Sequence, residues 1–170
     1  MTNTKILLVD DEPDVREVVR EILEDHVGQI FEAGNGEEAL QFLATNTVDA
    51  VLSDVNMPKV NGIEFLQSMR SRGDLTPFVV LTAFGDKDMA VEALRYGAFE
   101  FLDKPWDRNQ LKDTMLRAVE LGQEFNFWKN QPDMMQGLEE LRSENSEKSL
   151  NHLKKVLSMM SGFKNTGTKG

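Results

Sequence analysis

The stretch ILLVDDEPDVREVV, residues 6–19, decides the fold that we expect of this chain. It opens with a run of Ile, Leu and Val, which is typical of a strand buried on both faces of a parallel sheet. Two adjacent acids and a proline follow, and Pro13 suits the first turn of a helix. The stretch therefore predicts a buried strand, a turn that carries two carboxylates, and a helix that begins directly after them.

The alternation of apolar runs and helical periods continues as far as residue 122. Short strands that alternate with helices are typical of an α/β fold. We therefore predict a doubly wound, parallel, five-stranded (βα)5 sheet with an α-helical C-terminal extension. Strands are expected at 5–9, 29–33, 49–53, 77–81 and 99–102, and helices at 13–26, 35–46, 62–71, 86–98 and from about 107. The first helix is expected to bury Val15, Val18, Val19, Ile22 and Leu23.

The composition is that of an ordinary globular protein, with 40% hydrophobic and 28% charged residues and no cysteine. No apolar run approaches the ~20 residues that cross a bilayer, and the N-terminus lacks the pattern of a secretory signal. We therefore expect a cytoplasmic location and no membrane insertion. Residues 1–122 hold 23 Asp and Glu against 12 Lys and Arg, a balance that repels phosphate. We expect no direct binding to DNA.

Residues 123–170 predict an appendage rather than an output enzyme, with a domain boundary after residue 122. Residues 123–163 are expected to form a helical extension for dimerisation or partner docking, and residues 164–170 a disordered tail. No helix-turn-helix pattern is present, and His152 is interpreted as an ordinary surface or packing residue. The second half of the extension carries an apolar stripe at helical spacing, formed by Leu150, Leu153, Leu157 and Met160.

Polar side chains follow four of the five predicted strands. Asp10 and Asp11 follow the first, Asp54 the third, Thr82 the fourth and Lys104 the fifth. Because the carboxyl ends of parallel strands meet at one edge of a sheet, we expect these residues to share a pocket. Three carboxylates in one place are costly unless a cation neutralises them, and oxygen ligands without Cys or His suit Mg²⁺.

In such a pocket Asp54 is a candidate nucleophile, because a carboxylate can accept a phosphoryl group. Lys104 and the metal would offset charge on the phosphoryl oxygens, and Thr82 could hydrogen-bond one of them. Each residue alone has a plainer interpretation, since an Asp after a strand is more often a helix cap or a turn former. All five in the right order favour a shared site.

With these motifs the sequence closely resembles the receiver domain of two-component response regulators. The matching segments are ILLVDDE, DAVLSDVNMPKVNG, VVLTAFGD and GAFEFLDKPW, which follow the order of that family and cover about residues 1–122. The resemblance implies the flavodoxin-like fold of chemotaxis regulators. It also implies that Asp54 is phosphorylated by a sensor histidine kinase or a phosphotransfer protein.

The resemblance implies a metal site as well. Mg²⁺ would be bound by Asp11, Asp54 and the backbone carbonyl of Asn56. Asp10 would be the second acid of the metal pocket and would act through water.

A switch is implied too, in which Thr82 and Phe101 form the moving pair and Lys104 contacts the phosphoryl group. The bond between Lys104 and Pro105 would be cis. Switching would alter the face formed by residues 86–122, and this face, the C-terminal helices, or both would bind a protein partner or form a homodimer.

Three residues near the site bear on how the switch would work. Phe101 lacks the hydroxyl of the Tyr that is also common at its position, so packing alone would govern its rotation. Asn56 is neutral and cannot activate water as a base, and Phe84 adds an apolar group near the mouth of the site. Together they suggest a fairly long-lived acyl phosphate.

We therefore interpret the chain as a response-regulator receiver without a catalytic output domain. One alternative is a phosphorylation-independent adaptor that keeps only the fold, against which the intact set of site residues argues. A second is the N-terminal part of a longer signalling protein. A third is an aspartyl-phosphate phosphohydrolase of the haloacid-dehalogenase type, which would need an acid at Asn56.

Overall fold

The computed structural model describes residues 3–83 and 87–130 of the 170-residue chain. Packing divides the chain into two compact units, Met1–Gln123 and Glu124–Gly170, and the first contains the sheet. The apolar stripe at 150–160, His152 and the predicted tail at 164–170 lie outside the described residues. Among the residues that are described, no helix is both long enough and apolar enough to cross a membrane.

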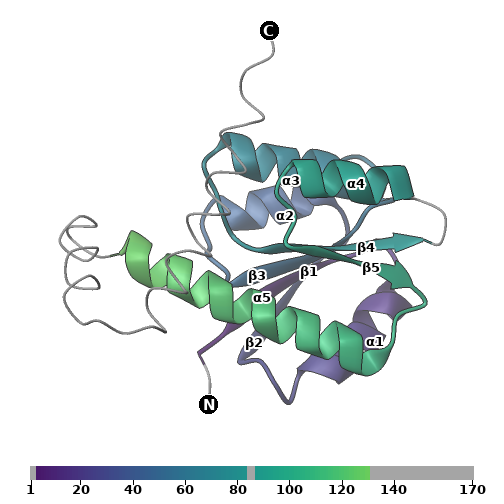
Figure 1. Cartoon of the computed structure of the whole chain (residues 1–170), viewed down its shortest axis with the longest axis horizontal. Helices are drawn as coiled ribbons and strands as arrows, with labels where there is room; N and C mark the ends of the chain where they lie inside the picture. Colours follow the sequence, from purple (N-terminus) through teal and green to yellow (C-terminus); the bar gives the residue numbers. More distant parts are fainter. Residues whose placement is uncertain (1–2, 84–86, 131–170) are drawn as a thin grey trace, which may run out of the picture. The chain divides into compact units, whose positions relative to one another are not determined.

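Within this described part, five strands and five helices alternate along the chain (Figure 1). In order they are β1 (Lys5–Val9), α1 (Pro13–Leu23), β2 (Gln29–Ala33), α2 (Gly36–Leu43), β3 (Ala50–Asp54), α3 (Gly62–Ser71), β4 (Phe78–Ala83), α4 (Lys87–Arg95), β5 (Glu100–Lys104) and α5 (Arg108–Lys129). Neighbouring strands are parallel, and their lateral order is β2-β1-β3-β4-β5. The predicted doubly wound sheet is confirmed, with the strand order of flavodoxin-like folds.

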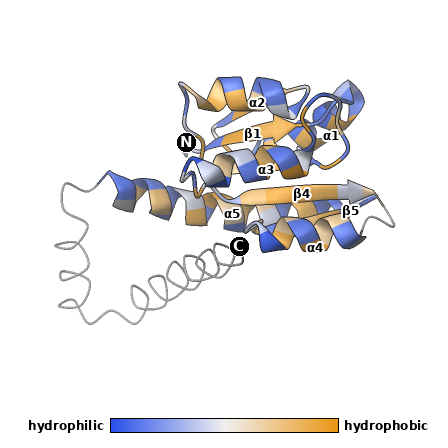
Figure 2. Cartoon of the chain, turned by 90° about the horizontal axis from the view of Figure 1, so that it is seen from above, coloured by the Kyte–Doolittle hydropathy of each residue, from blue (hydrophilic) through white to orange (hydrophobic). Residues whose placement is uncertain are grey.

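Two hydrophobic cores hold the helices against the two faces of the sheet. Alternate residues of a strand point to opposite faces, so Ile6 and Leu8 enter one core while Leu7 and Val9 enter the other. The first core includes side chains of α1 and α5, and the second includes those of α2, α3 and α4 (Figure 1). Figure 2 shows mostly hydrophobic strands between helices that carry both hydrophobic and polar residues. The sheet therefore lies between the two cores and contributes side chains to both.

Side-chain caps begin three of the helices that follow the carboxyl ends of the strands, and in α5 it is Asp107 that accepts hydrogen bonds from the backbone N–H groups of Asn109 and Gln110. Asn35 caps α2 by accepting a hydrogen bond from the backbone N–H of Glu38. Asn61 and Glu64 form a capping box at the start of α3, which spans the predicted residues 62–71. α1 begins with Pro13 in its first turn, as predicted. These local signals explain why helix starts were easier to predict than helix ends.

α1 differs from the prediction in its length and in one buried position. It ends at Leu23 rather than at residue 26, and α2 likewise ends before residue 46. Val18 was expected inside but is 41% exposed. It lies about 100° around the helix from buried Val19, and therefore at the outer margin of the stripe that faces the core.

β4 and β5 run on to Ala83 and Lys104, beyond the predicted ends at 81 and 102. The ladder continues because Thr82 pairs with Asp103 and Ala83 with Lys104. Polar residues after an apolar run suggested loops. At the carboxyl end of a strand, however, a residue with a polar side chain can still pair its backbone with the neighbouring strand. The backbones of Thr82, Asp103 and Lys104 are consequently held in register by the sheet.

Gly122 marks a point where α5 lies too close to the chain before β3 for a side chain to fit. A Cβ atom there would clash with the carbonyl oxygen of Asp49. We expect Gly122→Ala to lower the free energy of unfolding by about 1–3 kcal/mol, the usual cost of overpacking, although alanine favours a helix by up to about 1 kcal/mol. Urea denaturation measures the change, and Gln123→Ala, at an exposed neighbouring position, is the matched control. Equal stability of the two variants would contradict this close packing.

Candidate functional site

Three carboxylates and one ammonium lie at the carboxyl edge of the sheet. Asp10 and Asp11 directly follow β1, Asp54 ends β3, and Lys104 ends β5. Asp10 is fully buried and Asp54 is 5% exposed, whereas Asp11 is exposed. Segments that are far apart in the sequence thus bring four predicted site residues to one edge.

The Lys104 ammonium bridges the two buried acids. Its Nζ lies 3.1 Å from Oδ2 of Asp10 and 3.0 Å from Oδ1 of Asp54. The backbone N–H of Glu12 donates a further hydrogen bond of 2.9 Å to Oδ1 of Asp10. The bond between Lys104 and Pro105 is cis, as the resemblance implied. Because a buried carboxylate is costly without a partner, Lys104 offsets the repulsion between Asp10 and Asp54.

Burial and the charges of the site shift the pKa values of Asp54 and Lys104. Burial raises the pKa of the Asp54 carboxyl, with Lys104 opposing the shift and the charges of Asp10 and Asp11 adding to it. For Lys104, burial favours the neutral amine, but the hydrogen bonds and charges of Asp54 and Asp10 outweigh burial and raise its pKa. One ammonium beside three carboxylates leaves an excess of negative charge, which favours a further cation.

Arg16, which sequence reasoning missed, supports the end of β1 from the side of α1. Its Nη1 donates a hydrogen bond of 2.6 Å to the carbonyl oxygen of Asp10, and its Nε donates one of 3.2 Å to Oε2 of Glu32. Arg20 pairs with the same glutamate. Glu32 belongs to β2 and Asp10 directly follows β1, so these contacts tie α1 to the carboxyl ends of both strands. The spacing of the two arginines was visible in the sequence, but their partner across the sheet was not.

The two predicted switch residues lie on β4 and β5. Thr82 is buried, and its Oγ1 donates a hydrogen bond of 3.0 Å to Oδ1 of Asp103. Phe101 is 36% exposed, so its ring is only partly enclosed. Asp103 was read as a loop residue after a strand and was not predicted to belong to the site. Phe84, predicted at the mouth of the site, lies outside the described residues.

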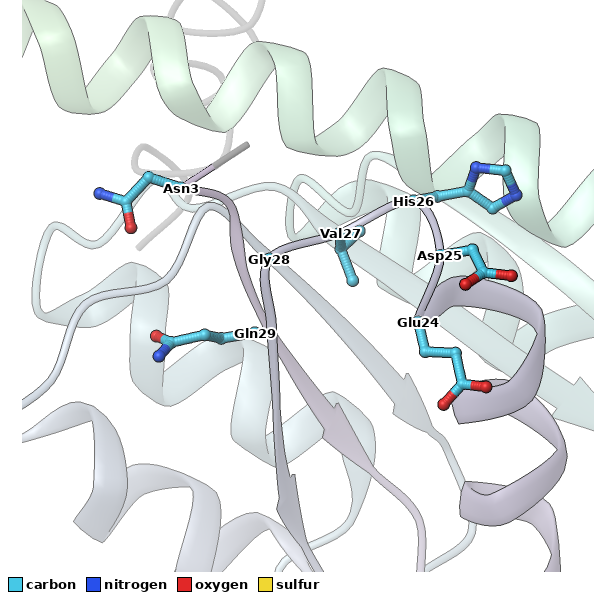
Figure 3. A pocket seen from close by; sticks show the side chains of 7 residues that line it. All are labelled: Asn3, Glu24, Asp25, His26, Val27, Gly28 and Gln29. Atoms are coloured by element: carbon cyan, nitrogen blue, oxygen red, sulfur yellow. The ribbon is translucent and has the colours of Figure 1, made fainter. Parts of the chain in front are cut away.

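A separate hollow of about 530 Å³ lies at the other end of the sheet (Figure 3). It is formed around the turn between α1 and β2 and is lined by Asn3, Glu24, Asp25, His26, Val27, Gly28 and Gln29. These residues precede β1 or lie at the start of β2 and before it, whereas the acids lie at the carboxyl ends of strands. The hollow is therefore not part of the acidic site.

A family model described as the response regulator receiver domain matches residues 6–116. The chain belongs to the receiver-domain family of response regulators. Response regulator protein PilR of Pseudomonas aeruginosa is 37% identical over 121 residues, which cover 71% of this chain and 27% of PilR. The sporulation initiation phosphotransferase F of Bacillus subtilis is 33% identical over 121 residues, which cover 71% of this chain and 98% of that protein.

A solved relative, the chemotaxis response regulator CheY4 of Vibrio cholerae, is 33% identical with a TM-score of 0.63. The match covers 69% of this chain and 99% of that one. By contrast, the chain spans only about a quarter of PilR and of the regulatory protein AtoC of Escherichia coli. The likeness to these longer relatives concerns the receiver domain alone.

Receiver domains bind Mg²⁺ at an acidic pocket, and the donor set of this receiver fits that ion. Asp10, Asp11 and Asp54 each offer a carboxylate oxygen, and these atoms lie within 4.8 Å of one another. Among the described residues, no other three acidic or histidine side chains come as close. The predicted ligand role of the Asn56 carbonyl stays a prediction.

We expect Asp11→Ala to weaken Mg²⁺ binding by about tenfold or more, because it removes one of three charged ligands. The same variant should be at least as resistant to urea as the native protein without metal, since it removes one of three like charges. Calorimetric titration with Mg²⁺ and urea denaturation in a chelator measure the two effects. Glu12→Ala, which removes the next exposed carboxylate along the chain, is the control. Equal Mg²⁺ affinities of the two variants would contradict the metal site.

We expect Glu32→Gln to lower stability at neutral pH more than at acid pH. Burial alone would raise the pKa of Glu32, but Arg20 and Arg16 outweigh it and lower this pKa. Such a carboxylate stabilises the fold above its ordinary pKa of 4.5, and the contribution is lost as the pH falls through the lowered value. Urea denaturation from about pH 7 down to the acid limit of the folded state measures it. The control is Glu21→Gln on α1, and a stability loss independent of pH would contradict the ion pairs.

Proposed function

We propose that this receiver accepts a phosphoryl group on Asp54 from a sensor histidine kinase or a phosphotransfer protein, with Mg²⁺ as cofactor. The observation that carries the proposal is the contact of 3.0 Å between Lys104 Nζ and Asp54 Oδ1 at the edge where strands end. A nucleophile is thus held beside a cation that can offset charge on an incoming phosphoryl group. The name of the sporulation phosphotransferase, a relative whose length the match nearly covers, supports phosphoryl transfer as the chemistry.

In the proposed step, a carboxylate oxygen of Asp54 attacks the phosphorus of a phosphohistidine. An O–P bond forms, the N–P bond breaks, and the freed imidazole nitrogen takes up a proton from water. Lys104 stays close to the developing negative charge, and Thr82 can donate a hydrogen bond to a phosphoryl oxygen. Asp10, Asp11 and Asp54 would hold Mg²⁺, which would supply positive charge to offset that of the phosphoryl group.

The phosphoryl group of the product carries roughly two negative charges and three acceptor oxygens, where the carboxylate carried one charge. We propose that these attract Thr82, and that Phe101 then turns into the space beside it. Four large hydrophobic side chains are exposed on α4, on the turn that follows it and on β5, and the movement would change their arrangement. They are Val91, Leu94, Tyr96 and Phe101. A partner or a second copy that binds one arrangement better would shift the population towards it.

Within this chain we propose a switch rather than an output enzyme. The acidic edge would gain and lose a phosphoryl group and catalyse no further reaction. The phosphorylated state would pass on the signal by a change in protein binding. The negative charge of residues 1–122 disfavours direct contact with DNA. The names of the longer relatives describe regulators, which agrees with an output through other proteins or domains.

We expect the native protein to gain one phosphoryl group from acetyl phosphate with Mg²⁺, and Asp54→Asn to gain none. The amide of asparagine is a poor nucleophile and cannot form the acyl phosphate. Intact-protein mass spectrometry measures the addition, and circular dichroism checks that the variant is folded.

Asp113→Asn on the exposed side of α5 is the matched control and should be labelled like the native protein. Labelling that persists in Asp54→Asn would contradict Asp54 as the acceptor. A native protein that takes up no phosphoryl group would instead favour an adaptor that works without phosphorylation.

A further inference from the structure

The hydroxyl of Thr82 already has a partner in this structure. Oγ1 donates to Oδ1 of Asp103 at 3.0 Å, and the two residues are paired in register across the parallel strands β4 and β5. Paired residues of neighbouring strands place their side chains on the same face of the sheet, with the strands about 4.8 Å apart. The register of the ladder therefore puts a carboxylate at position 103 within reach of this hydroxyl.

Lys104, the residue after Asp103, makes its contacts on the opposite face of the sheet. Successive residues of a strand point to opposite faces, so Asp103 and Lys104 diverge although they are adjacent in sequence. Lys104 reaches Asp10 and Asp54, while Asp103 reaches Thr82. The end of β5 thus contributes one side chain to the acidic pocket and another to the predicted switch.

A hydroxyl has one hydrogen to donate. A phosphoryl oxygen and a carboxylate oxygen are both acceptors, so Thr82 cannot donate to both at once. We propose that Asp103 is a positioning residue that holds Thr82 in the resting state and competes with the phosphoryl group for its hydroxyl. This inference rests on the proposed function, in which Asp54 carries the phosphoryl group and Thr82 contacts it.

The burial of Thr82 and Asp103 determines how strongly Asp103 competes with the phosphoryl group for the hydroxyl. Thr82 is 1% exposed, so its hydroxyl has little access to water and needs a protein partner or the phosphoryl group. The Asp103 side chain is exposed, so water can replace the hydroxyl once the bond breaks. Loss of the bond therefore costs Asp103 little, and we expect Asp103 to shift the equilibrium modestly, by about three- to tenfold.

The probe is beryllofluoride with Mg²⁺, which mimics a phosphoryl group on an aspartate. We expect Asp103→Ala to bind beryllofluoride about three- to tenfold more tightly than the native protein, measured by calorimetric titration at saturating Mg²⁺. Asp103→Asn should have a smaller effect, because its amide oxygen can still accept the hydrogen bond although the charge is gone. The Mg²⁺ affinity should stay the same in both variants, since Asp103 is not among the clustered acids.

The decisive comparison repeats Asp103→Ala in a Thr82→Val background, which lacks the hydroxyl. If Asp103 acts through Thr82, its removal should have no effect on beryllofluoride affinity there. An equal gain in both backgrounds, or an equal gain for Ala and Asn, would show a charge effect and overturn the proposal, as would no gain at all. Failure of the native protein to bind beryllofluoride would instead contradict the proposed function itself.

Discussion

The contacts of the Lys104 ammonium with Asp10 and Asp54 are the interaction on which the rest of this structure depends. Two buried carboxylates repel each other, and a single cation makes their proximity tolerable. The sheet supplies that cation from β5, at the far side of β4 from Asp54. The pocket therefore exists only when the lateral order of the strands is complete, and its residual negative charge favours a further cation.

The packing of helices on both faces of the sheet links this pocket to the surface. By the alternation of each strand, Asp54 and Lys104 share the face of the sheet that α1 and α5 cover, whereas Thr82 and Phe101 share the face of α2, α3 and α4. Charge added to Asp54 would thus act across the edge of the sheet on residues of the opposite face. Thr82 and Asp103, which share a hydrogen bond, both lie on that opposite face.

Sequence reasoning found most of the site because the chemistry lies at the ends of apolar runs. Asp10, Asp11, Asp54 and Lys104 each follow or end a strand that was recognisable from its composition. It missed Arg16 and Asp103, whose partners lie on other strands, and it placed Val18 inside although α1 turns it outward. These errors share a cause, because each of these positions depends on how one helix or strand is oriented against its neighbours.

The sequence by itself determined the order and type of the elements, the start of α1 at Pro13, the cap of α2 at Asn35, and the identity of the acids. These follow from local periodicity and capping, which act over a few residues. Only the tertiary structure decided which side chains meet: Lys104 contacts Asp10 across 94 positions of the chain. The strand order arises from the packing of two cores, which bring together segments that are far apart in the sequence.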